Sequence, residues 1–138
     1  MTTPFTTDMT ATDLELVVTD VLAVLELPFV ETSGTEEFSA WLTIHGPADI
    51  ALTVSADHAG ATAIAQAFFG DDFEDGDQAD AMKEIANVCA GGCKTMIEGE
   101  WTIGIPNAGT AHLAADALHT TCPAGAGRIL VGMGNKAD

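Results

Sequence analysis

Polar and apolar positions separate most cleanly between residues 77 and 98, where the sequence reads DQADAMKEIANVCAGGCKTMIE. Apolar residues recur there every three or four positions, which is the period of one face of an α-helix. We therefore predict a helix over residues 77–98. Its buried face would consist of Met82, Ile85, Ala86, Cys89, Cys93, Met96 and Ile97. Its opposite face, called the polar line below, consists of Asp80, Glu84, Asn87, Gly91, Lys94 and Glu98.

The same criteria predict the other elements. A first amphipathic helix begins with Thr12 or Asp13 as its N-cap and ends before Pro28, because a residue before proline avoids helical torsions. Residues 38–45 alternate imperfectly, a Gly-Pro turn follows, and residues 50–54 are rich in β-forming residues, so these two runs predict an antiparallel hairpin. A second helix spans residues 58–69 and stops at Gly70. Strands follow at 101–105, 111–122 and 128–133, joined by Gly- and Pro-rich turns.

This order of elements predicts one two-layer α/β (α+β) domain, with a mainly antiparallel sheet covered by long helices. Residues 12–138 would form the domain, and residues 1–11 a flexible N-terminal arm. Helix followed by strands occurs twice, around the second helix, which favours an internal duplication. Within the helix at 77–98, Asp77 is the predicted N-cap and Asp80 its capping-box partner.

Charge narrows the classes of partner. The 138 residues include 21 acidic and four basic ones, a net charge of −17. Such a chain repels the phosphates of nucleic acids and of anionic membranes, so we expect neither as a partner. The sequence also shows no signal peptide and no apolar stretch long enough to span a bilayer, and we expect a cytoplasmic protein.

The residues present argue against three other kinds of site. The acidic loop 71–77 resembles a calcium loop at three positions, but Phe73 and Met82 occupy two of its ligand positions. Cys89 and Cys93 lie on the apolar face of the predicted helix, which is typical of reduced core thiols rather than of a zinc site. The four histidines form no recognisable triad or metal pattern. We therefore predict no bound metal or cofactor in this chain.

The polar line carries the most specific signal. Asp80-x3-Glu84-x2-Asn87, followed by Gly91, Lys94 and then Pro106 after a strand, resembles the signature of the CheC/CheX/FliY family of chemotaxis phosphatases. The first predicted helix has Glu15 but Val18 three residues later, so it lacks a second Glu and Asn pair. The chain is therefore most similar to the single-site CheX-like type.

The resemblance implies a protein-aspartyl-phosphate phosphatase that acts on a phosphorylated CheY-like receiver domain. Asn87 would orient the attacking water, and Glu84 would dock onto a receiver lysine. Asp80, Gly91 and Lys94 are candidate partner-binding residues, although Asp80 also suits a helix N-terminus and Lys94 an ordinary exposed surface. Mg²⁺ is expected on the receiver, and a homodimer is the implied assembly. The alternative is a non-catalytic receiver-binding or flagellar-switch adaptor of the same fold.

Overall fold

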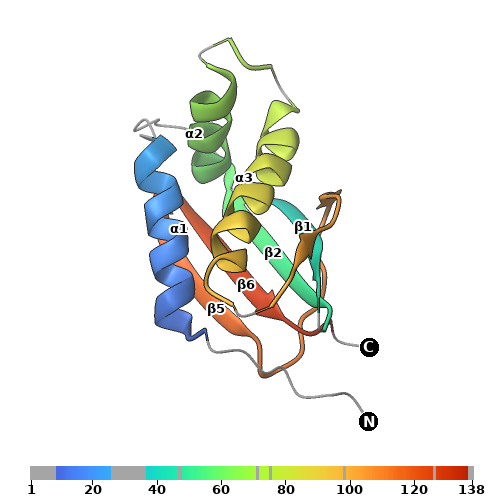
Figure 1. Cartoon of the computed structure of the whole chain (residues 1–138). Helices are drawn as coiled ribbons and strands as arrows, with labels where there is room; N and C mark the ends of the chain where they lie inside the picture. The colour runs from blue at the N-terminus through green and yellow to red at the C-terminus, as the bar shows by residue number, and fades with distance from the viewer. Residues whose placement is uncertain are drawn as a thin grey trace.

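The computed structural model describes residues 9–25, 37–46, 48–70, 72–74, 76–97, 99–125 and 127–136. Three helices lie together on one face of an antiparallel sheet (Figure 1). The helices are α1 (Ala11–Leu25), α2 (His58–Phe69) and α3 (Asp77–Lys94). The strands are β1 (Glu37–His45), β2 (Ile50–Asp57), β3 (Thr102–Ile103), β4 (Asn107–Ala108), β5 (Leu118–Ala124) and β6 (Gly127–Gly134). The predicted two-layer α/β fold is thereby confirmed.

The sheet has the strand order β3-β1-β2-β6-β5, and β4 pairs with β1 beside β3. Register follows from the alternation of small or polar residues with larger apolar ones. In β1, Leu42 and Ile44 are fully buried under the helices, whereas Trp41 and Thr43 lie on the opposite face. Helices therefore cover one face of the sheet, and the other face carries mainly hydroxyl-bearing and small side chains.

The core lies between this sheet and the helices. Its largest fully buried side chains include Leu14, Leu42, Ile44, Leu52, Ile64, Met82, Ile85, Ile129 and Met133. Each such side chain contributes roughly 1.5–3 kcal/mol relative to its exposed state. Leu14 belongs to α1, Ile64 to α2, and Met82 and Ile85 to α3. Because these side chains must face the core, their burial fixes the rotation of each helix about its axis.

The arrangement is close to symmetric about the middle of the sheet. The β1–β2 hairpin lies on one side and the β5–β6 hairpin on the other, and β2 pairs with β6 between them. Helix α1 packs on β5, and α3 packs on β1, so each long helix covers the hairpin of the other half. A duplicated helix-and-hairpin unit would give this topology, and the duplication itself stays a prediction.

Helix α2 has the predicted bounds because a specific capping residue marks each of its ends. Asp57 is its N-cap and accepts a hydrogen bond from Gly60 N at 2.8 Å. The same Oδ1 atom accepts one from Arg128 N at 3.1 Å, which ties the helix to the start of β6. At the other end Gly70 has φ of 83°, a conformation that suits glycine.

The start of α1 differs from the prediction. Thr10, rather than Thr12 or Asp13, begins the helix: its Oγ1 accepts from Asp13 N, and its own N donates to Asp13 Oδ2. This reciprocal pair is a capping box with aspartate in the third position. Met9 is buried in the core, so the packed part of the chain includes residues that we assigned to the arm. Residues 1–8 lie outside the described residues.

Both ends of α3 also differ from the prediction. Gly76, with φ of 102° and no side-chain cap, precedes the helix, so Asp77 is its first residue and not its N-cap. The helix ends at Lys94, four residues early. Thr95 explains this, because its hydroxyl donates to Gly92 O at 2.7 Å and its N to the same oxygen at 3.3 Å, a tighter turn. Ile97 is buried as predicted, whereas Met96 is exposed.

The strands after α3 are shorter than predicted. The expected strand over 101–105 is only β3, and a separate β4 follows Pro106. The patchy stretch 111–122 contributes only its end to β5, which continues through Pro123 and Ala124 to a tight turn at Gly125. Pro28, Asp71 and Asp75, on which we based a helix end and the calcium-loop comparison, lie outside the described residues. Within the described part of the chain, no helix has the length and apolar character needed to cross a membrane.

Candidate functional site

Helix α3 presents the polar line to solvent. Asp80, Glu84, Asn87 and Lys94 are exposed, and Gly91 is half-buried. Residues three or four apart on a helix are neighbours, with Cβ atoms about 5–6 Å apart, so Glu84 and Asn87 form one adjacent pair. Glu98 lies outside the described residues. The structure thus brings together the five residues that the sequence singled out, on one face of one helix.

The opposite face of α3 holds this pair in place. Met82, Ile85, Ala86 and Cys89 are fully buried beneath it, and α3 packs against β1, α1 and α2. Glu84 and Asn87 each lie directly beside one of these buried residues in sequence. A side chain on such an anchored helix is positioned more accurately than one on a loop.

Two consecutive glycines in α3 have different surroundings. A Cβ added at Gly92 would lie 2.7 Å from Val17 Cγ1, so Gly92 permits the close contact between α3 and α1. A Cβ added at Gly91 would meet nothing within 4 Å. No contact within the described chain therefore requires glycine at position 91, although a glycine inside a helix costs about 1 kcal/mol relative to alanine.

The ends of the polar line match the helix dipole. Asp80 lies in the first turn of α3, where partial positive charge favours an acid, and Lys94 lies in the last turn, where a base is favoured. Both residues thus have a structural reason to be present. The same dipole effect does not extend to Glu84 and Asn87, which lie in the middle of the helix.

The connection from β3 to β4 lies beside α3. Both short strands pair with β1, and both pack against α3. Pro106, which follows β3 in the motif, is half-buried there, and the preceding Ile105 is 86% exposed. Asn107 Nδ2 donates to Ile105 O at 3.1 Å and closes this turn. The motif's proline therefore belongs to the segment that borders the helix of the polar line.

Helix α1 does not offer a second site of the same kind. Glu15 is exposed, but Val18, at the position of the asparagine, is fully buried in the core. A polar side chain at position 18 would face the core and not solvent. The prediction of a single Glu and Asn pair agrees with this placement.

The cysteines face the core. Cys89, Cys93 and Cys122 are free thiols and all three are buried. Burial, with Cys93 and Cys122 close by, raises the pKa of Cys89 to about 12, and burial raises the pKa of Cys93 to about 12. A thiol that remains protonated is a poor nucleophile and metal ligand, so these residues take the structural role that the sequence indicated.

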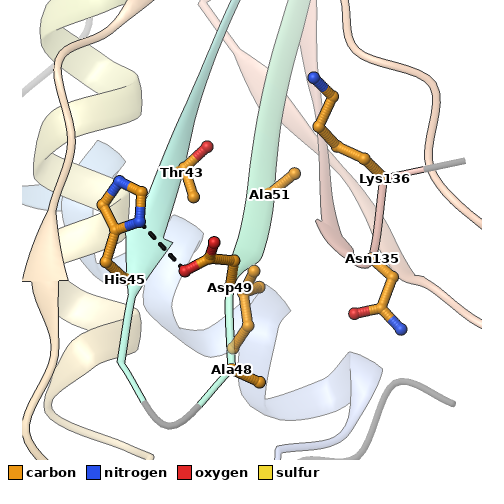
Figure 2. A pocket seen from close by; sticks show the side chains of 8 residues that line it. Thr43, His45, Ala48, Asp49, Ala51, Asn135 and Lys136 are labelled. Atoms are coloured by element: carbon orange, nitrogen blue, oxygen red, sulfur yellow. Dashed lines mark hydrogen bonds and ion pairs between the residues drawn. The ribbon is translucent and has the colours of Figure 1, made fainter. Parts of the chain in front are cut away.

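A pocket of about 430 Å³ lies elsewhere, on the sheet face away from the helices (Figure 2). His45 Nδ1 and Asp49 Oδ1, 3.0 Å apart, form one of its walls, and Asn135 and Lys136 form the other. Neither Glu84 nor Asn87 lines this pocket or two smaller ones on the sheet and on α1. The polar line is an open helix face, which suits a macromolecular partner better than a small ligand.

Comparison with known proteins decides the family. The family described as chemotaxis phosphatase CheX matches residues 38–124, which include nearly all of β1 and the whole of β2, α2 and α3. The chain belongs to the CheX family. The match contains Glu84 and Asn87 as well as Pro106.

Solved structures of chemotaxis proteins share the fold of this chain. A putative chemotaxis protein from Desulfovibrio vulgaris Hildenborough superposes with a TM-score of 0.67 at 19% identity, covering 89% of this chain and 94% of that one. A CheX from Desulfovibrio desulfuricans gives 0.61 at 20%, with 89% and 96% covered. The CheX–CheY–BeF3–Mg²⁺ complex from Borrelia burgdorferi gives 0.63 at 16%, with 91% and 97% covered. No curated protein sequence matches the chain significantly.

Sequence reasoning missed two residues of α3 in this CheX-family chain. In the sequence, Gly92 looks equivalent to Gly91. Only the structure separates them, because a Cβ added at Gly92 would collide with Val17. Lys83, one turn before Asn87, was not considered at all. The sequence does draw attention to Lys83, because only four of the 138 residues are basic.

Proposed function

We propose that this protein hydrolyses the phosphoaspartate of a CheY-like receiver domain. The observation that carries the proposal is the adjacent, exposed placement of Glu84 and Asn87 on α3, within the segment that matches the CheX family. The water oxygen would attack phosphorus in line while the bond from phosphorus to the aspartyl oxygen breaks. The products are inorganic phosphate, the free receiver carboxylate and a proton.

Asn87 would orient the water. Its side-chain oxygen can accept a hydrogen bond from water, and the amide is neither consumed nor required to change protonation. Phosphoryl transfer depends mainly on positioning and electrostatic stabilisation, so holding one water in line is a sufficient contribution. Mg²⁺ would be held by the receiver and would neutralise charge on the phosphoryl oxygens.

Glu84 would fix the register between the two proteins. Its side chain is exposed one turn before Asn87, and its carboxylate can form a charge-assisted hydrogen bond with a lysine on the receiver. That contact would place α3 so that Asn87 points at the phosphoryl group. Gly91, one turn further on, would leave space for the partner backbone, and Asp80 and Lys94 would contact the receiver at the two ends of the helix.

The assembly proposed for this chain is a homodimer. Support comes from the family, whose CheX-type members are expected to be dimeric. A mass close to twice 14.2 kDa in light scattering is the expected result. A mass that stays at the monomer value at every concentration tested would contradict this part of the proposal.

The test measures phosphate release from a panel of phosphorylated CheY-type receivers with and without the protein. Acceleration of at least one receiver is expected. Replacing Glu84 with alanine should weaken binding to that receiver, whereas Glu15→Ala, an exposed glutamate on α1, should not. A stable complex with a phosphorylated receiver whose phosphate is lost no faster would instead identify the adaptor function.

A further inference from the structure

The four basic residues of this chain fall into two pairs on opposite sides of the molecule. Lys83 and Lys94 belong to α3. Arg128 and Lys136 lie at the two ends of β6, where Arg128 alternates with the buried Ile129 and Lys136 Nζ lies 4.5 Å from the ring centre of Trp41 on the far face of the sheet. Half of the positive charge is therefore on the helix that carries Glu84 and Asn87.

On α3 the two lysines flank Asn87 on one side. At about 100° per residue, Lys83 lies about 40° and Lys94 about 20° from Asn87 in the same direction, and Glu84 lies about 60° the other way. Lys94 lies eleven positions after Lys83, which corresponds to about 16 Å along the helix. Asn87 lies between them. We call Lys83 and Lys94 the basic flank.

The segment of α3 that carries Asn87 and Lys94 contains no acids, whereas Lys83 lies beside Glu84 and three residues after Asp80. No acidic residue occurs between Ile85 and Ile97, in a chain with 21 of them. In the part of the chain that the structure describes, neither lysine forms an ion pair, and the pair His45–Asp49 is on the opposite face of the sheet. Lys94 is exposed and Lys83 is half-buried, so each side chain has surface that a partner covering Asn87 would reach.

We infer that the basic flank binds the acidic rim of the receiver's phosphorylation site and thereby steers and orients docking. This inference rests on the function proposed above and adds the surface that recognises the substrate. A phosphorylated aspartate carries about two negative charges, and a Mg²⁺ beside it is usually held by one or two further carboxylates. A partner of that chemistry meets two cations beside the position where Asn87 must approach it.

The overall charge makes this local complementarity necessary. A net charge of −17 repels an anionic partner at distances up to the Debye length, about 8 Å at physiological salt. Charges placed opposite each other at the contact act at shorter range and set the association rate and the register. The basic flank would therefore affect binding of the receiver and not the rate of the chemical step.

The test compares two double variants of equal net charge. Lys83→Gln with Lys94→Gln removes the basic flank, and Arg128→Gln with Lys136→Gln removes the other pair; glutamine keeps a helix propensity close to that of lysine. In phosphate-release assays with a CheY-type receiver at low salt, the first variant should raise KM about three- to tenfold with kcat unchanged. The second should leave both unchanged. At about 1 M salt the difference should disappear.

Three results would overturn the inference: an unchanged KM in the basic-flank variant, an equal rise in both variants, or a fall in kcat without a rise in KM. A binding measurement with a receiver loaded with Mg²⁺ and beryllofluoride distinguishes failure of this inference from failure of the proposed phosphatase function. If the wild-type protein releases no phosphate yet binds that receiver, weaker binding of the basic-flank variant alone still supports the inference, and equal binding of both variants contradicts it.

Discussion

Val17 on α1 occupies the space that a side chain on Gly92 of α3 would need, with 2.7 Å between Val17 Cγ1 and an added Cβ. The neighbouring Gly91 has open space at the same point. Two glycines that look alike in the sequence thus serve different purposes. Gly92 allows the helices to approach each other, and Gly91 lies on the surface proposed to meet the receiver.

The first prediction concerns stability. Gly91→Ala should raise the free energy of unfolding by about 1 kcal/mol, because alanine is the better helix former and its methyl group meets nothing. Gly92→Ala gains the same propensity but must displace a stiff β-branched side chain, and overpacking costs about 1–3 kcal/mol. Gly92→Ala should therefore be less stable than Gly91→Ala by about that amount in urea denaturation. Equal stability of the two variants would contradict the packing described for Gly92.

A second prediction uses Gly91 to test the docking surface. Gly91→Leu places a bulky side chain one turn from Asn87, at a position where an added Cβ meets nothing within 4 Å, and leucine is a good helix former, so the protein should stay folded. KM for the phosphorylated receiver should rise at least severalfold, since the partner can no longer approach closely. Ala23→Leu, at an exposed position of α1, is the matched control and should leave KM unchanged. A normal KM for Gly91→Leu would show that the partner does not come near this position.

The third prediction concerns alkaline pH. The pKa values of Cys89 and Cys93 rise from 9.0 to about 12 on folding, so the native thiols stay protonated where the unfolded ones ionise. Their stabilising contribution is complete below pH 9 and is lost as the pH rises from about 9 to about 12. By pH 10 the loss should be on the order of 1–3 kcal/mol for both thiols together.

Measuring the free energy of unfolding at several pH values above 8 checks this prediction. A variant with alanine at both positions is less stable throughout, because it leaves a cavity, but its stability should fall less steeply with pH. In the wild-type protein, a thiol reagent should react with neither residue until the chain unfolds. Rapid labelling of the native protein, or parallel pH profiles for the two proteins, would contradict the burial of these thiols.

Local sequence patterns are sufficient for the rotation of α3 and for the bounds of α2. The period of the apolar residues placed Glu84 and Asn87 together on an exposed face, because burial of Met82, Ile85 and Cys89 fixes the rotation of α3. Helix α2 was predicted with both bounds correct; Gly70 marked its end, and the structure adds Asp57 as the N-cap at its start. The family signature then added the chemistry that the spacing could not supply.

The remaining differences depend on contacts between distant segments or on competing turns. Met9 is buried because it joins the hydrophobic core formed by distant segments, which nothing in the neighbouring residues indicates. Helix α3 ends early because Thr95 competes for the carbonyl of Gly92. The short β3 and β4 are strands only because β1 pairs with both of them. The role of Gly92 likewise depends on α1, which lies about 75 residues earlier in the sequence.

The measurement that tests the central claim most directly is the rate of phosphate loss from a phosphorylated CheY-type receiver with Asn87→Ala. The variant should bind a receiver carrying Mg²⁺ and beryllofluoride nearly as well as the wild type, yet fail to accelerate phosphate loss, because no side chain orients the water. Asn135→Ala, on the far side of the sheet, should remain fully active. If Asn87→Ala releases phosphate as fast as the wild-type protein does, α3 is not the catalytic surface.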